Sequence, residues 1–195
     1  ELAKSYPIRV LRRAKKMGLG SAYVYAFKSI LTSSQDVNLL VMEMDADLSH
    51  DPAAIPKFLE KVKECDLILG SRYVPGGKIE NWNFFRRLIS RLGNIYARVI
   101  LGLPFKDLTG GYKLYKREVL ENIDLDSLSS VGYNFQIETT YKAHLKGYKI
   151  CEIPITFTER KVGTSKFNLG IILESFWKVL CLRLKAIPTT RISSE

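Results

Sequence analysis

The sequence predicts an α/β fold in which a mostly parallel sheet is flanked by helices. Two short apolar runs, residues 39–44 and 66–70, are typical of buried strands. Residues 52–64 between them have helical spacing, and a helical crossover favours parallel pairing of the strands that it joins. The chain has 195 residues, 46% of them hydrophobic, so it can bury one substantial core. We expect residues 1–195 to form a single domain.

The other elements follow in chain order. Gly18 opens a helix that runs to about Leu31, and a polar turn separates this helix from the first strand. The turn at residues 75–77 ends the second strand region, because proline and two glycines interrupt any regular element there. The remaining spacing predicts a helix over 83–101, a strand after Gly110 and Gly111 through Tyr115, a helix over 134–146, a strand over 149–158 and a helix over 169–184.

Composition limits the possible functions. Lys and Arg outnumber Asp and Glu by 30 to 20, so we expect an anionic partner: nucleic acid, a membrane surface or a phosphate-bearing substrate. Cys65, Cys151 and Cys181 lack metal-ligand spacing and are expected to be reduced core thiols of a cytosolic protein. Charged residues interrupt the apolar stretch at 171–187, so no transmembrane helix is expected. Without an initial Met or a signal segment, the start looks like a cut.

Two acids one residue apart, Asp45 and Asp47, follow the first strand. Ligands of open α/β folds bind at the carboxyl ends of the strands, where carboxylates can hold a hard divalent ion that carries phosphates. The alternative is that both acids are turn and cap residues, because Asp51 and Pro52 open the next helix. The D-x-D pattern is short and common, so spacing alone leaves both interpretations open.

The helix over residues 83–101 is amphipathic and basic. Its apolar side could lie among acyl chains while guanidinium groups bind lipid phosphates. The alternative is a surface helix whose apolar stripe packs on the sheet. The neighbouring aromatic residues Trp82, Phe84 and Phe85 favour the membrane interpretation. The arginines of this helix are Arg86, Arg87, Arg91 and Arg98.

A basic loop follows the last predicted strand. Residues 158–166 contain three cations, two hydroxyl side chains beyond Thr158, and Gly163. Arginine offers a planar fork for two phosphate oxygens and lysine a point charge, so the loop could bind phosphate. The alternative is a solvated surface loop without a ligand.

Together these segments resemble the polyprenol (dolichol) phosphate mannose synthases, which are family-2 glycosyltransferases with the GT-A nucleotide-sugar transferase fold. The resemblance covers nearly the whole chain and keeps the family's order of motifs. Family members usually have a first strand and a nucleotide-base loop, neither of which precedes Gly18, so we expect a fragment that lacks the first βαβ region. The motifs are GLGSA at 18–22, MDADLSHDP at 44–52, GSRY at 70–73, DLTGGYK at 107–113, and ER followed by GTSK at 159–166.

The resemblance implies transfer of mannose from GDP-mannose to polyprenyl (dolichyl) phosphate, with release of GDP and help from Mg²⁺ or Mn²⁺. Asp45 and Asp47 match the family's ligands for the metal and the donor diphosphate. Arg72 and Arg160 match arginines near the donor and acceptor phosphates, and these four residues are the expected catalytic set. The expected substrate-binding residues are Arg86 and Ser90, which match contacts to the lipid phosphate, Ser165 and Lys166 of the basic loop, and Asp107, for which a turn role is the alternative.

The chemistry is consistent with this set of residues. A lipid phosphate is anionic near neutral pH and needs no general base, so the protein's task is to neutralise charge between two anionic substrates. The expected partners are GDP-mannose, polyprenyl phosphate and the cytoplasmic face of a membrane, to which the chain attaches peripherally. Nucleic acid is not expected, because the acids and bases gather at strand ends rather than alternating with aromatics on an open face.

Two alternative functions stay open from the sequence. One is a glucosyltransferase that uses UDP-glucose and the same lipid, since selectivity for base and sugar resides largely in the segment expected to be missing. The other is a non-catalytic module that binds anionic membranes through the net charge of +10.

Overall fold

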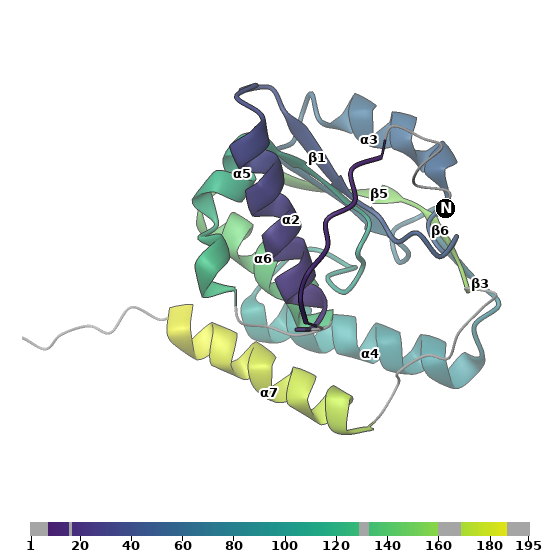
Figure 1. The fold of residues 1–195 in the computed structure, drawn as a ribbon. Coiled ribbons are helices and arrows are strands. Elements are labelled where there is room, and N and C mark those ends of the chain that lie inside the picture. The colour runs from purple at the N-terminus through teal and green to yellow at the C-terminus, as the bar shows by residue number, and fades with distance from the viewer. Residues whose placement is uncertain (1–7, 16, 129–132, 160–168, 187–195) are drawn as a thin grey trace, which may run out of the picture.

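The computed structural model describes residues 8–15, 17–128, 133–159 and 169–186 (Figure 1). Its main sheet has four strands in the order β1-β4-β2-β5, and a separate two-stranded sheet pairs β3 with β6. The strands are β1 (Leu40–Glu43), β2 (Leu67–Ser71), β3 (Lys78–Glu80), β4 (Lys113–Lys116), β5 (Ile150–Pro154) and β6 (Thr156–Thr158). The helices are α2 (Leu19–Ser33), α3 (Ile55–Lys61), α4 (Phe84–Leu101), α5 (Arg117–Asn122), α6 (Tyr133–Leu145) and α7 (Leu169–Ala186), with 3₁₀ turns η1 (Pro52–Ala54) and η2 (Leu125–Ser127).

The predicted α/β fold with flanking helices is confirmed, and the main sheet is mixed, with three of its four strands in one direction. The strands β1, β2 and β5 run in one direction, and β2 pairs in parallel with β5. The direct pairing expected between the first two strands is wrong, because β4 lies between β1 and β2 and is antiparallel to both. The helical crossover predicted the common direction of the two strands but could not predict which strand lies beside each of them. That residues 1–195 form a single domain stays a prediction.

Helices cover both faces of the main sheet (Figure 1). Along β2, Leu67 and Leu69 pack into the larger core cluster, whereas Ile68 packs into the smaller one. This alternation follows from the two-residue period of a strand. The larger cluster includes residues of α2, α4, α5, α6 and α7, and the smaller one includes Phe58 of α3. The sheet is therefore buried on both sides, which leaves its edge of strand ends as the place for a site.

Several predicted elements differ from those observed. The expected helix over 52–64 is the turn η1 followed by the short helix α3, because Pro56 lacks an N–H and is tolerated only in the first helical turn. The strand expected over 149–158 divides at Ile155 into β5 and β6, which belong to different sheets. The elements β3, α5 and η2 were not predicted, since each is six residues or shorter.

Cys65 and Cys151 are joined by a disulfide, so the expectation of reduced thiols is wrong for this pair. Cys65 precedes β2 and Cys151 lies on the neighbouring strand β5, and their Cα atoms are 6.1 Å apart. The strand pairing brings the two cysteines together across 86 residues of sequence, which spacing could not reveal. Cys181 is a free thiol.

None of the helices in the described part of the chain combines the length and the apolar character needed to cross a bilayer.

Candidate functional site

The predicted site residues that the structure describes lie after strand ends and on α4. Asp45 and Asp47 follow β1, and Arg72 follows β2, which runs in the same direction as β1. The carboxyl ends of these strands therefore meet at one edge of the sheet. Arg160, Ser165 and Lys166 belong to residues 160–168, which are outside the described part of the chain.

The loop after β1 positions its two acids differently. Asp45 is half-buried, and its backbone N–H donates to Nδ1 of His50 at 3.0 Å. Asp47 is exposed, and its Oδ1 accepts from the backbone N–H and the hydroxyl of Ser49 at 3.1 and 2.5 Å. The cap of η1 is instead Asp51, whose carboxylate accepts from the N–H of Ala53 at 2.9 Å. The cap interpretation thus applies to Asp51, whereas the turn interpretation describes Asp47 in part.

His50 anchors this loop, a role that the sequence did not indicate. Its ring is buried, is stacked on Tyr112 with a centroid separation of 4.8 Å, and meets Phe157 edge-on at 5.5 Å. Burial and the nearby charge of Arg72 lower the pKa of His50 to about 4. The imidazole is therefore neutral at pH 7, which leaves Nδ1 able to accept the N–H of Asp45.

We expect His50→Phe to remove part of the acid sensitivity of folding. As the pH falls from 6.5 to 4, the unfolded chain protonates its histidine before the folded chain does, so the free energy of unfolding falls. A pKa lowered from 6.5 to about 4 corresponds to a loss of about 3 kcal/mol over this range. Urea unfolding of both proteins at pH 7 and pH 4, in EDTA, measures the difference. His144→Phe is the control and should keep the full loss, and equal losses with and without His50 would contradict the assignment.

Asp45 and Asp47 offer hard oxygen ligands for a divalent cation. Among the described residues, no group of three or more His, Cys, Asp and Glu side chains is placed to hold a metal by itself. Mg²⁺ in particular is commonly held by one or two carboxylates together with substrate phosphates and water. The acidic pair therefore fits a cation that is shared with a phosphate-bearing ligand, and does not fit a closed structural metal site.

Arg72 and Asp107 form a buried ion pair. The Nε and Nη2 atoms of Arg72 donate to the two carboxylate oxygens of Asp107, each at 2.7 Å, and the backbone N–H of Arg72 donates to the same carboxylate at 2.9 Å. Burial alone would raise the pKa of Asp107, but the Arg72 charge and hydrogen bonds hold it below its ordinary value. Nη2 of Arg72 also donates to the hydroxyl of Thr109 at 2.8 Å. Asp107 thus fixes the orientation of Arg72.

Hydrogen bonds connect this pair to α4. The hydroxyl of Tyr73 donates to Oγ of Ser90 at 2.7 Å. The amide of Asn94, one turn further along α4, donates to the carbonyl of Ser90 at 2.9 Å and to the hydroxyl of Thr109 at 3.1 Å, and it accepts from the N–H of Leu108 at 2.7 Å. Ser90 is therefore held beside the Arg72 loop. Tyr73 and Asn94 were not predicted as site residues.

Arg86, in the first turn of α4, contacts the same aromatic ring as Arg72. Its guanidinium forms an ion pair with Glu159, and its Cζ lies 4.2 Å from the ring centroid of Trp82. The Cζ of Arg72 lies 5.6 Å from the same ring and 5.5 Å from the ring of Phe157. Because Phe157 also contacts His50, its ring links Arg72 to the loop that carries Asp45 and Asp47.

A buried polar network lies behind the acidic pair. Glu43, two residues before Asp45 on β1, accepts hydrogen bonds from the amide of Gln136 and, at 3.2 Å, from the hydroxyl of Tyr115. Burial raises the pKa of Glu43 to about 7, against the opposing effects of Lys113 and these donors. Burial also lowers the pKa of Lys113 to about 8. The network joins β1, β4 and α6. In the sequence it is indicated only by Glu43, an acid inside an apolar strand.

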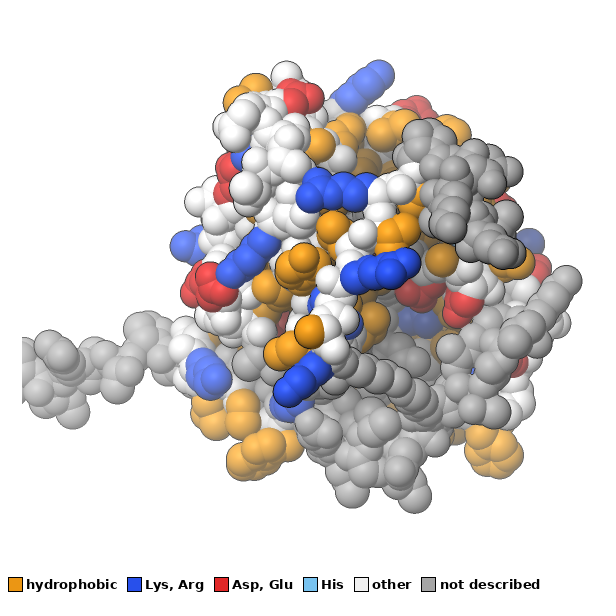
Figure 2. Space-filling view, in the orientation of Figure 1, with side chains coloured by type: hydrophobic (Ala, Val, Ile, Leu, Met, Phe, Trp, Pro, Cys, Tyr) orange, Lys and Arg blue, Asp and Glu red, His pale blue; other side chains and the backbone are white. Residues whose placement is uncertain are grey.

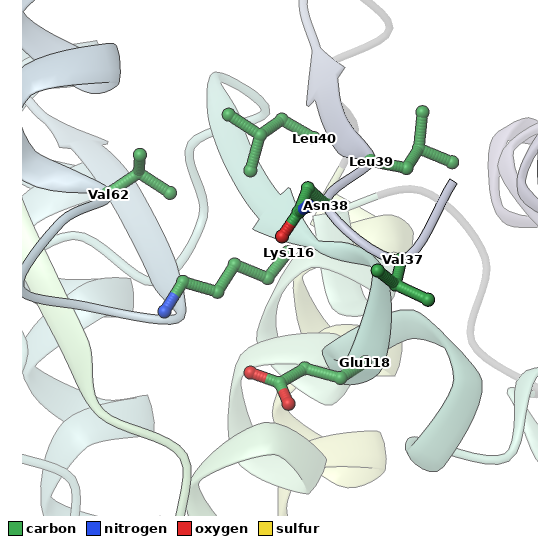
Figure 3. Close-up of a pocket in the computed structure, with 7 residues that line it drawn as sticks. All are labelled: Val37, Asn38, Leu39, Leu40, Val62, Lys116 and Glu118. Carbon is green, nitrogen blue, oxygen red and sulfur yellow. The ribbon is translucent and has the colours of Figure 1, made fainter.

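A separate pocket of about 420 Å³ lies at the opposite end of β1 (Figure 3). Lys116 and Glu118 supply its charged groups, and none of the predicted site residues lines it. The remaining lining residues are Val37, Asn38, Leu39, Leu40 and Val62.

Comparison with known proteins gives strong matches. Residues 1–124 match the family described as Glycosyl transferase family 2. The chain is 45% identical over 173 residues to the Undecaprenyl-phosphate mannosyltransferase of Micrococcus luteus, covering 89% of this chain and 70% of that protein. It is 44% identical over 182 residues to the Polyprenol monophosphomannose synthase of Mycolicibacterium smegmatis, covering 92% and 68%. The Dolichol-phosphate mannosyltransferase of Pyrococcus furiosus is 40% identical over 177 residues, covering 89% and 47%.

Solved structures share the fold at lower identity. The glucosyl-3-phosphoglycerate synthase from Mycobacterium tuberculosis, crystallised with Mn²⁺, uridine diphosphate and phosphoglyceric acid, superposes with a TM-score of 0.54 and 16% identity. The match covers 96% of this chain and 58% of that one. The chain therefore spans somewhat more than half of that structure's length.

Proposed function

Because this chain belongs to glycosyltransferase family 2, we propose that it transfers mannose from GDP-mannose to the phosphate of a polyprenyl lipid. The observation that carries the proposal is the identity of 45% over 89% of the chain to a protein named undecaprenyl-phosphate mannosyltransferase. The expected GT-A fold agrees with the family and with the structural match. Asp45 and Asp47 follow β1 and Arg72 follows β2 at one edge of the sheet, and Arg86 contacts Trp82 beside Arg72. This placement supports a reaction between two anionic substrates.

In this reaction a phosphate oxygen of the lipid attacks the anomeric carbon of mannose, and the bond from that carbon to the diphosphate of GDP breaks. The attacking oxygen is already anionic, so no side chain has to remove a proton. Asp45 and Asp47 would hold a divalent cation, Mg²⁺ or Mn²⁺, which when bound supplies positive charge to the leaving diphosphate. Arg72, held rigidly by Asp107, supplies fixed positive charge without reorganisation during the reaction.

The acceptor phosphate is assigned to the side of the site formed by α4. Arg86 and Ser90 lie one turn apart, and Tyr73 and Asn94 fix the position of Ser90. Arg86 pairs with Glu159, so an incoming phosphate would compete with this carboxylate for the guanidinium. Arg160 follows Glu159 directly in the chain and Ser165 and Lys166 come shortly after it, and we assign all three to the phosphates as well.

The lipid acceptor requires contact with a membrane, and we assign this contact to α4 and α7. Figure 2 shows hydrophobic side chains at the lower left and lower right of the displayed face, near the ends of the region where these helices lie in Figure 1. On α4, Phe84 and Phe85 are 72% and 73% exposed, and on α7 Trp177 is 65% exposed. Exposed apolar side chains beside Arg87 and Arg91 suit peripheral binding to the anionic cytoplasmic leaflet.

We expect Phe85→Glu to weaken binding to anionic vesicles at least about tenfold. Insertion of one phenylalanine side chain contributes roughly 1.5–3 kcal/mol, and about 1.4 kcal/mol corresponds to a tenfold change in affinity. Sedimentation with phosphatidylserine-containing vesicles measures the bound fraction. Val37→Glu is the matched control, because Val37 is 80% exposed but lies at the other end of β1. Equal binding of the two variants would contradict the assigned surface.

The reaction is tested with radiolabelled GDP-mannose and UDP-glucose in separate assays, each with polyprenyl phosphate and with or without Mg²⁺ or Mn²⁺. The expected result is metal-dependent passage of mannose into the lipid phase from GDP-mannose alone. Transfer of glucose from UDP-glucose would replace the proposed donor. Absence of transfer from either donor by the protein would overturn the proposed reaction.

A further inference from the structure

The indole ring of Trp82 contacts both arginines of the site. The centroid of its indole ring is 4.2 Å from Cζ of Arg86 and 5.6 Å from Cζ of Arg72, and the ring of Phe157 meets it edge-on at 5.4 Å. The sequence grouped Trp82 with Phe84 and Phe85 as membrane-facing aromatics. The structure separates them, because both phenylalanines are largely exposed whereas Trp82 is half-buried against the arginines. Trp82 is therefore part of the site.

The indole N–H of Trp82 is buried and has no hydrogen-bond partner among the described residues. Buried polar groups are nearly always satisfied, so an orphan donor in a site calls for an acceptor from a ligand. An indole nitrogen can only donate, which excludes a cationic or purely donating partner. The carboxylate of Glu159 pairs with Arg86 and does not accept from the indole N–H.

We propose that Trp82 is a substrate-binding residue whose indole N–H donates a hydrogen bond to an oxygen of the acceptor phosphate. This inference rests on the proposed function, because it takes the ligand between Arg86 and Arg72 to be the lipid phosphate. The indole face orients the Arg86 guanidinium by a cation–π contact, while the N–H supplies a donor that phenylalanine cannot supply. The phosphate thus meets two cations and one neutral donor that are already held in place.

Kinetics of Trp82→Phe separate the N–H from the ring. Loss of one hydrogen bond to a charged oxygen should raise the KM for polyprenyl phosphate about tenfold. The KM for GDP-mannose should stay within about twofold, which a general loss of structure would not produce. Trp82→Leu, which also removes the aromatic face, should raise the KM for polyprenyl phosphate further. Tyr25→Phe, which removes an exposed hydroxyl on α2, is the control and should leave both KM values unchanged. An unchanged acceptor KM in Trp82→Phe would overturn the proposal.

Fluorescence tests the contact without turnover. The chain has two tryptophans, so in the Trp177→Phe protein the emission comes from Trp82 alone. A short-chain polyprenyl phosphate should shift this emission with a saturable dependence, and the corresponding polyprenol without phosphate should not. A shift by inorganic phosphate alone would identify a general phosphate site rather than a lipid one, and would overturn the assignment to the acceptor.

Calorimetry with the same polyprenyl phosphate distinguishes the two failures. Binding without any emission change would overturn the role of Trp82 and leave the proposed function standing. Binding with the emission change, but without sugar transfer, would overturn the proposed function and retain the phosphate contact. Absence of binding would overturn both.

Discussion

Asp45→Asn should lower the rate of mannosyl transfer by about 10²- to 10³-fold, the usual effect of removing one preorganised charged group from a site. Asparagine keeps the size of the side chain, and the hydrogen bond from this residue to His50 comes from the backbone, so the loop should keep its shape. The substitution removes one negative charge from the proposed cation site. Initial rates at saturating substrates, measured over a range of Mg²⁺ and Mn²⁺ concentrations, give the effect.

The control for this prediction is Asp36→Asn. Asp36 is an exposed acid in the loop before β1, and its side-chain oxygen accepts a hydrogen bond from the N–H of Asn38 that an asparagine can also accept. Its activity should equal that of the unaltered protein. If Asp45→Asn retains more than half of the activity at every metal concentration, Asp45 is not a ligand of an essential cation.

Asp107→Ala should lower the free energy of unfolding by roughly 3–5 kcal/mol, because it leaves the Arg72 guanidinium buried without its carboxylate. Three hydrogen bonds from Arg72 end on Asp107, so the loss includes unsatisfied donors as well as charge. Urea unfolding monitored by circular dichroism measures the change. The double variant Asp107→Ala with Arg72→Leu should recover part of the loss, since the uncompensated charge is then gone.

Glu121→Ala is the matched control for the buried pair. Glu121 accepts from Nε of Arg117 at 2.7 Å, the same distance as in the buried pair, but its side chain is 45% exposed. Exposed ion pairs typically contribute about 0–1 kcal/mol, so this variant should remain close to the unaltered protein. Similar losses in Asp107→Ala and Glu121→Ala would contradict the view that burial makes the Arg72 pair essential.

The sequence predicted the strands and long helices well because their apolar periodicity is local information. The position of β4 in the strand order could not be predicted, because residues 113–116 do not indicate which strands pair with them. The Cys65–Cys151 disulfide was missed for the same reason, because it depends on the pairing of β2 with β5. Short elements such as β3 and α5 carry too few residues for a periodic signal.

The site shows a similar division. Motifs placed Asp45, Asp47 and Arg72 at strand ends, and the structure has them there. Partners were harder to predict, because the contact between Arg72 and Asp107 spans 35 residues and could be seen only in the folded chain. His50 was not predicted as a site residue, and Trp82 was grouped with the membrane-facing aromatics, because the sequence does not show whether a ring is buried beside a charged group.

Asn94 has a consequence for how such a chain would work on a bilayer. Its amide donates both to the Ser90 carbonyl of α4, the helix that we propose faces the lipid, and to the Thr109 hydroxyl that Arg72 contacts. A tilt or sinking of α4 would pull on this hydroxyl, and through it on the guanidinium. The depth of α4 in the bilayer and the orientation of the Arg72 guanidinium would then be coupled. Bilayers of different thickness would therefore change the turnover rate without contacting any reacting atom.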